Sequence, residues 1–224
     1  MSEPLIRFHA SDAHPGITVD EGEMVILTAP PGGGTSAALR ALAGEAPFPE
    51  GGQALVAGQD LARLSHRMRR RARQSLRLFH LPHDPPLISN LTVMENLLLP
   101  SKFLGESPEG ETAREGFLLL EAAGVGWTAG LLPGSLPLEI RKAVALIRGF
   151  LRRPRVALLD DPLGELDDVG VAGIRPLLRG TLAAGRCAML VAARDLRHFE
   201  GIRFRKVEMP SFHSTGQPVP GEPA

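Results

Sequence analysis

The stretch LTAPPGGGTSAALRALAG, Leu27 to Gly44, combines three local signals that decide the fold. It continues the apolar run GEMVILTA, residues 22–29, which has the length and composition of a buried strand. Three glycines break the run, and small residues at helical spacing follow as far as Gly44. The order of strand, glycine loop and helix predicts one unit of an α/β fold.

The glycine loop resembles the phosphate-binding frame G-x-x-x-x-G-K-[ST], but its lysine is missing. Threonine stands in the lysine position, and the hydroxyl position is kept as serine. In such a loop, backbone N–H groups at a helix N-terminus hold the phosphates, the lysine neutralises the outer ones and the hydroxyl binds magnesium. The candidate nucleotide-binding residues in this loop are Gly32, Gly33, Gly34, Thr35 and Ser36.

The change to Thr35 lowers the expected affinity for a nucleotide. Threonine donates one neutral hydrogen bond, and a charge-assisted bond is about twice as strong. Pro30 and Pro31 also lack N–H donors. We expect weak binding of ATP, while an ordinary glycine-rich turn that binds nothing is an equally open interpretation.

Composition limits the class of protein. The 224 residues, 43% of them hydrophobic, suffice for one globular domain with a subdomain. A formal net charge of zero gives no overall attraction to nucleic acid, so we interpret the arginines of residues 63–77 as the solvated face of a helix. Cys187, the single cysteine, is interpreted as a core side chain. With no apolar run of 18 residues and no signal peptide, we expect a cytosolic chain.

The remaining pattern alternates strands with helices. RVALLDD, residues 155–161, and the run around CAMLVAA, residues 187–193, predict buried strands of a parallel sheet. Residues of about 82–148 are mainly helical, with expected breaks at Pro100, Gly105 and Pro108, and predict an inserted helical subdomain. Residues 51–61 resemble a short hairpin, and residues 209–224 predict a disordered tail.

These tracts, in this order, resemble the nucleotide-binding subunit of an ATP-binding-cassette (ABC) transporter over about residues 5–208. The most specific tract is RRPRVALLDDPLGELDD, residues 152–168, while NLTVMENLLLP, residues 90–100, resembles the lipid- and lipoprotein-handling branch. The resemblance implies an α/β fold of the P-loop NTPase kind. We expect a three-layer sandwich with a mainly parallel sheet, a small antiparallel N-terminal β part and the helical subdomain, in one domain over residues 1–208.

The resemblance also implies which residues carry the chemistry. Ser36 and Asp160 match the magnesium-side hydroxyl and carboxylate. Asp161 matches the catalytic glutamate but is one methylene shorter, so it reaches the attacking water poorly. Arg194 matches the switch histidine, and His80 matches a glutamine that senses magnesium and the membrane partner. A plainer interpretation is open for each: a turn at the paired aspartates, a surface ion pair of Arg194 with Asp195 or a neighbouring acid, and a packed or solvated histidine.

Two tracts correspond to subunit-interface motifs of the family, and one matches its motif closely while the other does not. GELDD, residues 164–168, resembles the D-loop at a subunit interface. LPLEI, residues 136–140, stands where the family has LSGGQ, so Pro137 removes an N–H and Glu139 brings a negative charge toward phosphate. Phe8 is a candidate, though a poor one, for the adenine-stacking aromatic.

These substitutions predict a catalytically degenerate subunit that binds ATP and Mg²⁺ weakly and hydrolyses ATP negligibly. We expect it to pair with itself or with a competent ABC subunit and to dock on an integral-membrane permease at the inner face of the plasma membrane, through residues near 80–86. No nucleic-acid partner is expected. Two alternatives stay open: an active ATPase that tolerates these substitutions, and a soluble regulatory scaffold without a permease.

Overall fold

The larger of two sheets contains five parallel strands in the order β5-β6-β7-β3-β8. The computed structural model describes residues 3–9, 16–30, 32–48, 52–104 and 108–209. The strands of this sheet are β3 (Met24–Thr28), β5 (Phe79–Leu81), β6 (Val156–Asp160), β7 (Ala188–Ala192) and β8 (Arg205–Glu208). The predicted parallel sheet is confirmed.

The smaller sheet is antiparallel and has the order β2-β1-β4. Its strands are β1 (Ile6–His9), β2 (Ile17–Val19) and β4 (Gln53–Val56). The expected hairpin in residues 51–61 is wrong, because β4 pairs along its length with the distant β1 and makes only an isolated bridge from Val56 to Gln59. Pairing with β1 buries Ala54 and Val56, which a local hairpin would leave exposed.

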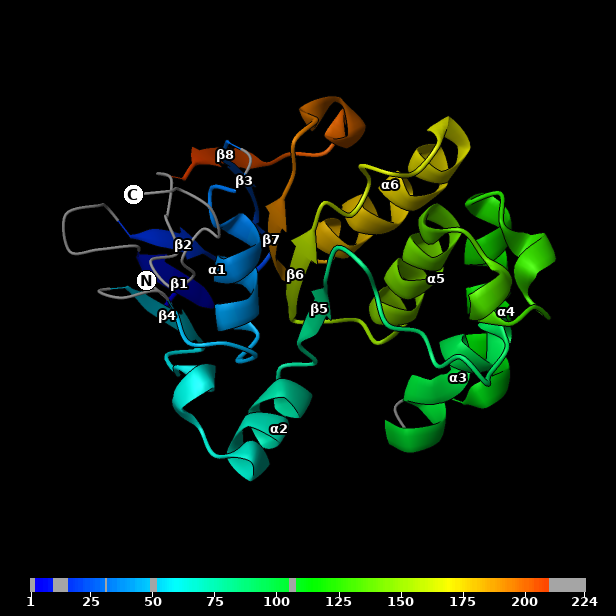
Figure 1. Ribbon diagram of the computed structural model, residues 1–224, viewed down its shortest axis with the longest axis horizontal. Coiled ribbons are helices and arrows are strands. Elements are labelled where there is room, and N and C mark those ends of the chain that lie inside the picture. The colour runs from blue at the N-terminus through cyan, green and yellow to red at the C-terminus, as the bar shows by residue number, and fades with distance from the viewer. Residues whose placement is uncertain (1–2, 10–15, 31, 49–51, 105–107, 210–224) are drawn as a thin grey trace, which may run out of the picture.

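Helices cover both faces of the larger sheet and complete three layers (Figure 1). The α-helices are α1 (Thr35–Leu42), α2 (His66–Ser75), α3 (Val93–Leu104), α4 (Glu109–Ala122), α5 (Leu138–Leu151) and α6 (Asp168–Ala183). The described residues also contain the short 3₁₀ turns η1 (Leu61–Arg63), η2 (Gly126–Thr128), η3 (Pro133–Ser135) and η4 (Leu196–Phe199). In Figure 1, α1 and the small sheet lie on one side of the larger sheet, and α5 and α6 lie on the other.

The apolar strands are buried on both faces. Along β3, Val25 and Leu27 join the core shared with α1 and the small sheet, while Met24 and Ile26 join the core under α5 and α6. Successive side chains of a strand point to opposite faces, so covering both faces requires an unbroken apolar run. This is why β3, β6 and β7 were visible in the sequence as continuous apolar stretches.

The helices α3, α4 and α5 follow β5 and precede β6 in the chain. Thr92 and Glu95 exchange hydrogen bonds at the start of α3 and form a capping box. Asn96 is fully buried, and its amide bonds the backbone of Ile88 in both directions, which fixes the segment that enters the helix. The expected break at Pro100 is wrong, because this proline lies inside α3.

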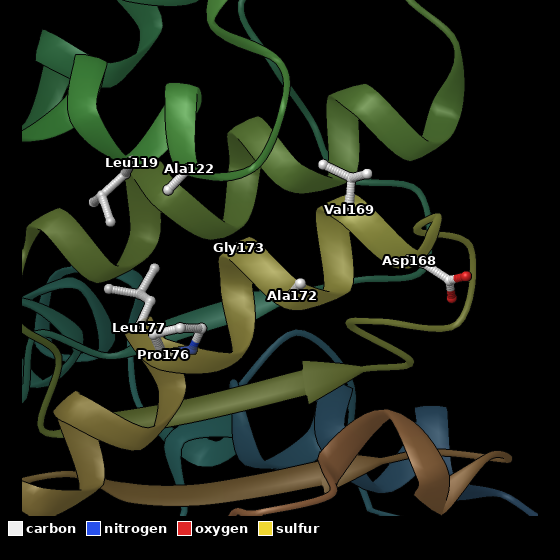
Figure 2. Close-up of a pocket in the computed structure, with 8 residues that line it drawn as sticks. All are labelled: Leu119, Ala122, Asp168, Val169, Ala172, Gly173, Pro176 and Leu177. Carbon is white, nitrogen blue, oxygen red and sulfur yellow. The ribbon is translucent and has the colours of Figure 1, made fainter.

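An apolar groove runs between α4 and α6 and is lined by Leu119 and Ala122 on one side and by Val169 and Leu177 on the other (Figure 2). The two helices meet backbone to backbone at Gly173, where a Cβ would lie 2.1 Å from the carbonyl oxygen of Ala122. Only glycine fits this position.

Further predictions from the sequence concern Cys187, the arginines of α2, membrane-spanning segments and the C-terminal residues. Cys187 is buried, and burial raises the pKa of its thiol to about 12, as expected of a packing residue. On α2, Arg69 donates to the carbonyl of Leu64 and Arg73 donates to the carbonyl of Ala43. These two arginines therefore connect α2 to neighbouring segments and do not only face solvent. Within the described ranges, no helix has the length and apolar character needed to cross a bilayer. Most of the expected tail, residues 210–224, lies outside the described residues.

Candidate functional site

A cavity of about 790 Å³ opens where α1 begins, at the carboxyl ends of β3, β6 and β7. Carboxyl ends of neighbouring parallel strands meet at one edge of a sheet, which is where α/β proteins bind ligands. The lining residues are 27–30, 32–37, Arg40, His83, Asp160, Asp161 and 192–194. The cavity thus gathers the described glycine-loop residues, the paired aspartates Asp160 and Asp161, which resemble the Walker B carboxylates of the family, and Arg194, but not His80.

The glycine loop owes its course to three consecutive glycines. Gly32 and Gly34 have φ angles of 78° and 83°, a left-handed conformation that other residues rarely adopt. A Cβ at Gly33 would lie 2.6 Å from the Cβ of Ala29 and 2.9 Å from the carbonyl oxygen of Pro30. The loop therefore forms a tight backbone cradle that any side chain at Gly33 would fill.

The N-terminus of α1 presents free backbone donors to this cradle. Gly34 is the N-cap residue and has no side chain with which to cap the helix. Within the described part of the chain, the N–H groups of Ser36 and Ala37 have no backbone acceptor. The helix dipole adds partial positive charge at the same place, so the donor set suits phosphate oxygens. Ser36 is exposed, with its hydroxyl one position after the threonine that replaces lysine.

On the opposite wall, Asp160 is the last residue of β6 and Asp161 follows it. Asp161 has a φ angle of 46°, and its N–H donates to Ala192 O at 2.8 Å. Its carboxylate leans on its own turn, because a Cβ at Gly164 would lie 2.3 Å from Asp161 Oδ2. Burial raises the pKa of Asp161, while the positive charges of Lys142 and Arg194 counteract this rise.

A buried ammonium lies behind Asp161. Lys142 on α5 is fully buried, and its Nζ donates to Asp161 O at 2.9 Å and to Glu165 Oε2. The other carboxylate oxygen of Glu165 lies 3.2 Å from Nε2 of His83. These contacts join the cavity wall, the strand end and the D-loop-like segment 164–168 through side chains that the sequence alone did not connect.

His80 lies away from the cavity. Its Nδ1 is 3.0 Å from Oε1 of Glu45, its side chain is only 3% exposed, and this hydrogen bond lowers the pKa of Glu45. The expected histidine position is therefore shifted: His83, three residues later, lines the cavity instead. No local sequence signal separates His83 from His80, because the choice depends on where β5 (Phe79–Leu81) lies in the sheet.

Arg194 does not pair with Asp195, which was one of the two kinds of acidic partner that the plainer interpretation allowed. Asp195 instead forms a bidentate ion pair with Arg197. The hydrogen bonds from Arg197 lower the pKa of Asp195 to about 2. Arg194 is exposed on the cavity rim. Sequence reasoning missed Arg40, a second guanidinium on the same cavity, because a helical arginine carries no motif signal.

The tract LPLEI forms the start of α5. Pro137 is its N-cap residue without a side-chain cap bond, and Glu139 is exposed in the first turn. A carboxylate there neutralises the helix dipole that would otherwise attract an anion. Phe8 cannot serve as an adenine platform, because it is 1% exposed and packs against Phe48.

The comparisons with known proteins agree with this architecture. The family model described as ABC transporter matches residues 14–164, which is more than half of the chain. The chain belongs to the ABC transporter family. Within this family it matches ATP-binding subunits. The lipoprotein-releasing system ATP-binding protein LolD of Ruegeria sp. (strain TM1040) is 32% identical over 181 residues, covering 80% of this chain and 78% of that protein.

Further relatives point the same way. LolD of Pseudomonas syringae pv. tomato is 30% identical over 179 residues, covering 78% of this chain and 76% of that protein. A solved ATP-binding subunit of an ABC transporter superposes with a TM-score of 0.75 at 23% identity, over 92% of this chain and 86% of that one. The dimeric ATP-binding cassette MJ0796, bound to ADP and Pi, gives the same TM-score at 20% identity, over 92% and 94%. These structural matches confirm the predicted fold class.

Proposed function

We propose that this ABC subunit binds MgATP weakly and hydrolyses it at a negligible rate, so that it serves its transporter mainly as a nucleotide-binding scaffold. The single observation that carries the proposal is the uneven make-up of the cavity. The glycine cradle and the free N–H groups of α1 are present, whereas the groups that would drive hydrolysis are altered.

The residues present fit a magnesium nucleotide. The N–H groups of Ser36 and Ala37 would hold phosphate oxygens, and Ser36 and Asp160 would contribute oxygen ligands to magnesium. Within the described ranges, no cluster of three or more His, Cys, Asp or Glu side chains could hold a metal alone. Magnesium in nucleotide sites does not need such a cluster, because it usually binds through one or two protein oxygens together with phosphates and water.

Hydrolysis is expected to fail at Asp161 and at α5. The bound nucleotide supplies the phosphoryl bond to be broken, and this chain must hold a water in line with it. The short carboxylate of Asp161 leans on the turn at Gly164, so it is poorly placed to act as a base on that water. In a homodimer, Glu139 would face the partner's phosphates with a like charge.

The test is to titrate the full-length chain with MgATP by calorimetry and to measure phosphate release in the same buffer. We expect measurable binding that largely disappears with a chelator or with Ser36→Ala, and turnover far below the range of about 1 per second or more of ordinary enzymes. Turnover in that range would overturn the scaffold proposal and favour an active ATPase.

We further propose that the subunit docks on a permease at the inner face of the plasma membrane and pairs there with itself or with another ABC subunit. Two exposed apolar residues beside α3, Ile88 and Leu131, support docking in this region. The N–H of Ile88 donates to the side chain of Asn96 on α3, and the carbonyl of Leu131 accepts from the N–H of Val93, the first residue of α3. The lipoprotein-releasing relatives support lipid-linked cargo. We keep residues 1–208 as one domain, with a helical subdomain of about residues 82–148. Leu131→Glu should reduce recovery of the chain with membranes, whereas unchanged recovery would contradict docking there.

A further inference from the structure

The cavity contains two guanidinium groups where the usual ammonium is absent. Arg40 lies on α1 and Arg194 follows β7, and both line the cavity. Within the described residues, neither side chain makes a hydrogen bond or ion pair, in contrast to Arg155, Arg197 and Arg205. Two unpaired cations on the rim of a cradle for phosphates form a receptor for an anion.

Arg40 is placed to reach the cradle from below. It lies four residues after Ser36, so both residues share one face of α1, one helical turn apart. Side chains of a helix lean toward its N-terminus, which directs Arg40 toward the Ser36 and Ala37 end. Their neighbours Ala38, Leu39, Ala41 and Leu42 are buried, so the exposed face of the helix is the one that meets the cavity.

A plainer explanation of Arg40 is its place in the last turn of α1, where a cation stabilises the helix dipole. That effect requires the guanidinium to lie near the C-terminal carbonyls. Arg40 also lines the cavity together with the residues of the helix N-terminus, so a role in the cavity is open to it beside this effect.

Arg194 lies on the other side of the cavity, close enough to Asp161 that its charge lowers the pKa of that carboxyl. In a phosphate-binding loop, backbone N–H groups hold the inner phosphates, and the terminal phosphate points toward the Walker B carboxylates. We therefore expect Arg40, on the helix that begins at the cradle, to lie nearer the inner phosphates, and Arg194, whose charge acts on Asp161, to lie nearer the terminal one.

We propose that Arg40 and Arg194 jointly replace the charge of the missing lysine, with Arg40 binding phosphates common to ADP and ATP and Arg194 binding the terminal phosphate of ATP. The inference rests on the proposed binding of nucleotide at this cavity. In this arrangement, two guanidinium groups at the edge of the cavity carry the positive charge that a single lysine ammonium usually carries in the loop.

The experiment measures dissociation constants for MgADP and MgATP by calorimetry on the full-length chain and on Arg40→Gln and Arg194→Gln. Loss of one charge-assisted contact should weaken binding about tenfold. Arg40→Gln should weaken both nucleotides by this factor, whereas Arg194→Gln should weaken MgATP and leave MgADP within about twofold. Arg40→Lys and Arg194→Lys should retain most of the affinity, because they keep the charge.

The matched control is Arg71→Gln, which removes an exposed arginine of α2 that does not line the cavity and should change neither constant. Thermal unfolding of each variant checks that the fold is kept. Binding of both nucleotides by both glutamine variants as tightly as by the unchanged chain would overturn this inference and leave the proposed function standing. Equal weakening of MgADP and MgATP by Arg194→Gln would overturn the assigned division. Failure of the unchanged chain to bind either nucleotide would overturn both proposals.

Discussion

Replacing Lys142 with methionine should lower the free energy of unfolding by about 3 kcal/mol. Methionine keeps the volume of the side chain, so the main loss is the two hydrogen bonds from the buried ammonium to Asp161 O and Glu165. Removing one partner of a buried ion pair costs about 3–5 kcal/mol, because the other charge is left uncompensated. The side chain of Glu165 is 29% exposed, so water can hydrate it in part, and we expect the lower end of that range.

The assay is thermal and urea-induced unfolding of the full-length chain. For a chain of this size, a loss of about 3 kcal/mol corresponds to a fall in Tm of about 6–12 °C. The double variant Lys142→Met/Glu165→Gln should recover at least about 1 kcal/mol, because it also removes the stranded carboxylate. Lys102→Met serves as control, since its pair with Glu109 is exposed and should contribute less than about 1 kcal/mol.

The reasoning would be refuted if Lys142→Met lowered the free energy of unfolding by less than about 1 kcal/mol. It would also be refuted if the loss in the double variant equalled the sum of the losses in Lys142→Met and Glu165→Gln measured singly. Either result would mean that the ammonium does not stabilise the segment from Asp161 to Glu165. A loss equal to that of Lys102→Met would have the same meaning.

Three further changes test the cavity itself. Thr35→Lys should raise the affinity for MgATP about tenfold by restoring the ammonium, with phosphate release still below about one per minute; robust turnover would mean that the unchanged Asp161 is competent. Gly33→Ala should weaken MgATP at least about tenfold, because its Cβ would lie 2.6 Å from that of Ala29, and unchanged binding would show that the cradle is not used. Burial raises the pKa of Asp161 above 3.8, so the native chain holds this proton longer than the unfolded chain, and stability falls as pH rises through that window. Asp161→Asn should remove this fall and be more stable than the unchanged chain at pH 7 in urea unfolding; parallel pH profiles would contradict it.

The strands that carry the cavity could be predicted because they are buried on both faces. β3, β6 and β7 each read as a short unbroken apolar run. β8 could not be found in this way, because it is an edge strand of mostly exposed residues with the sequence RKVE. Pro100 was expected to end a helix, yet the packing of α3 against its neighbours holds the helix through it.

The site was predictable where local sequence sets the backbone. The three glycines and the paired aspartates lie in the cavity as the motif implies. His83 and Arg40 were missed because their positions depend on where β5 starts and on which face of α1 stays open, and neither is encoded locally. The contacts of Lys142 were also unpredictable, since residue 142 and residue 165 approach each other only through the packing of α5 against β5 and α6.

The contact at Gly173 has a mechanical consequence. Helices that meet through side chains can absorb a small displacement by changing rotamers, but here the backbone of α6 rests on the last turn of α4 with no side chain between them. A force applied to α4 therefore passes to α6 with little compliance. The first residue of α6 follows Asp167, whose carboxylate caps the helix by accepting from Gly170 N at 2.7 Å. A displacement of α4 is thus transmitted along α6 to residues 164–168, which follow Asp161 in the wall of the cavity.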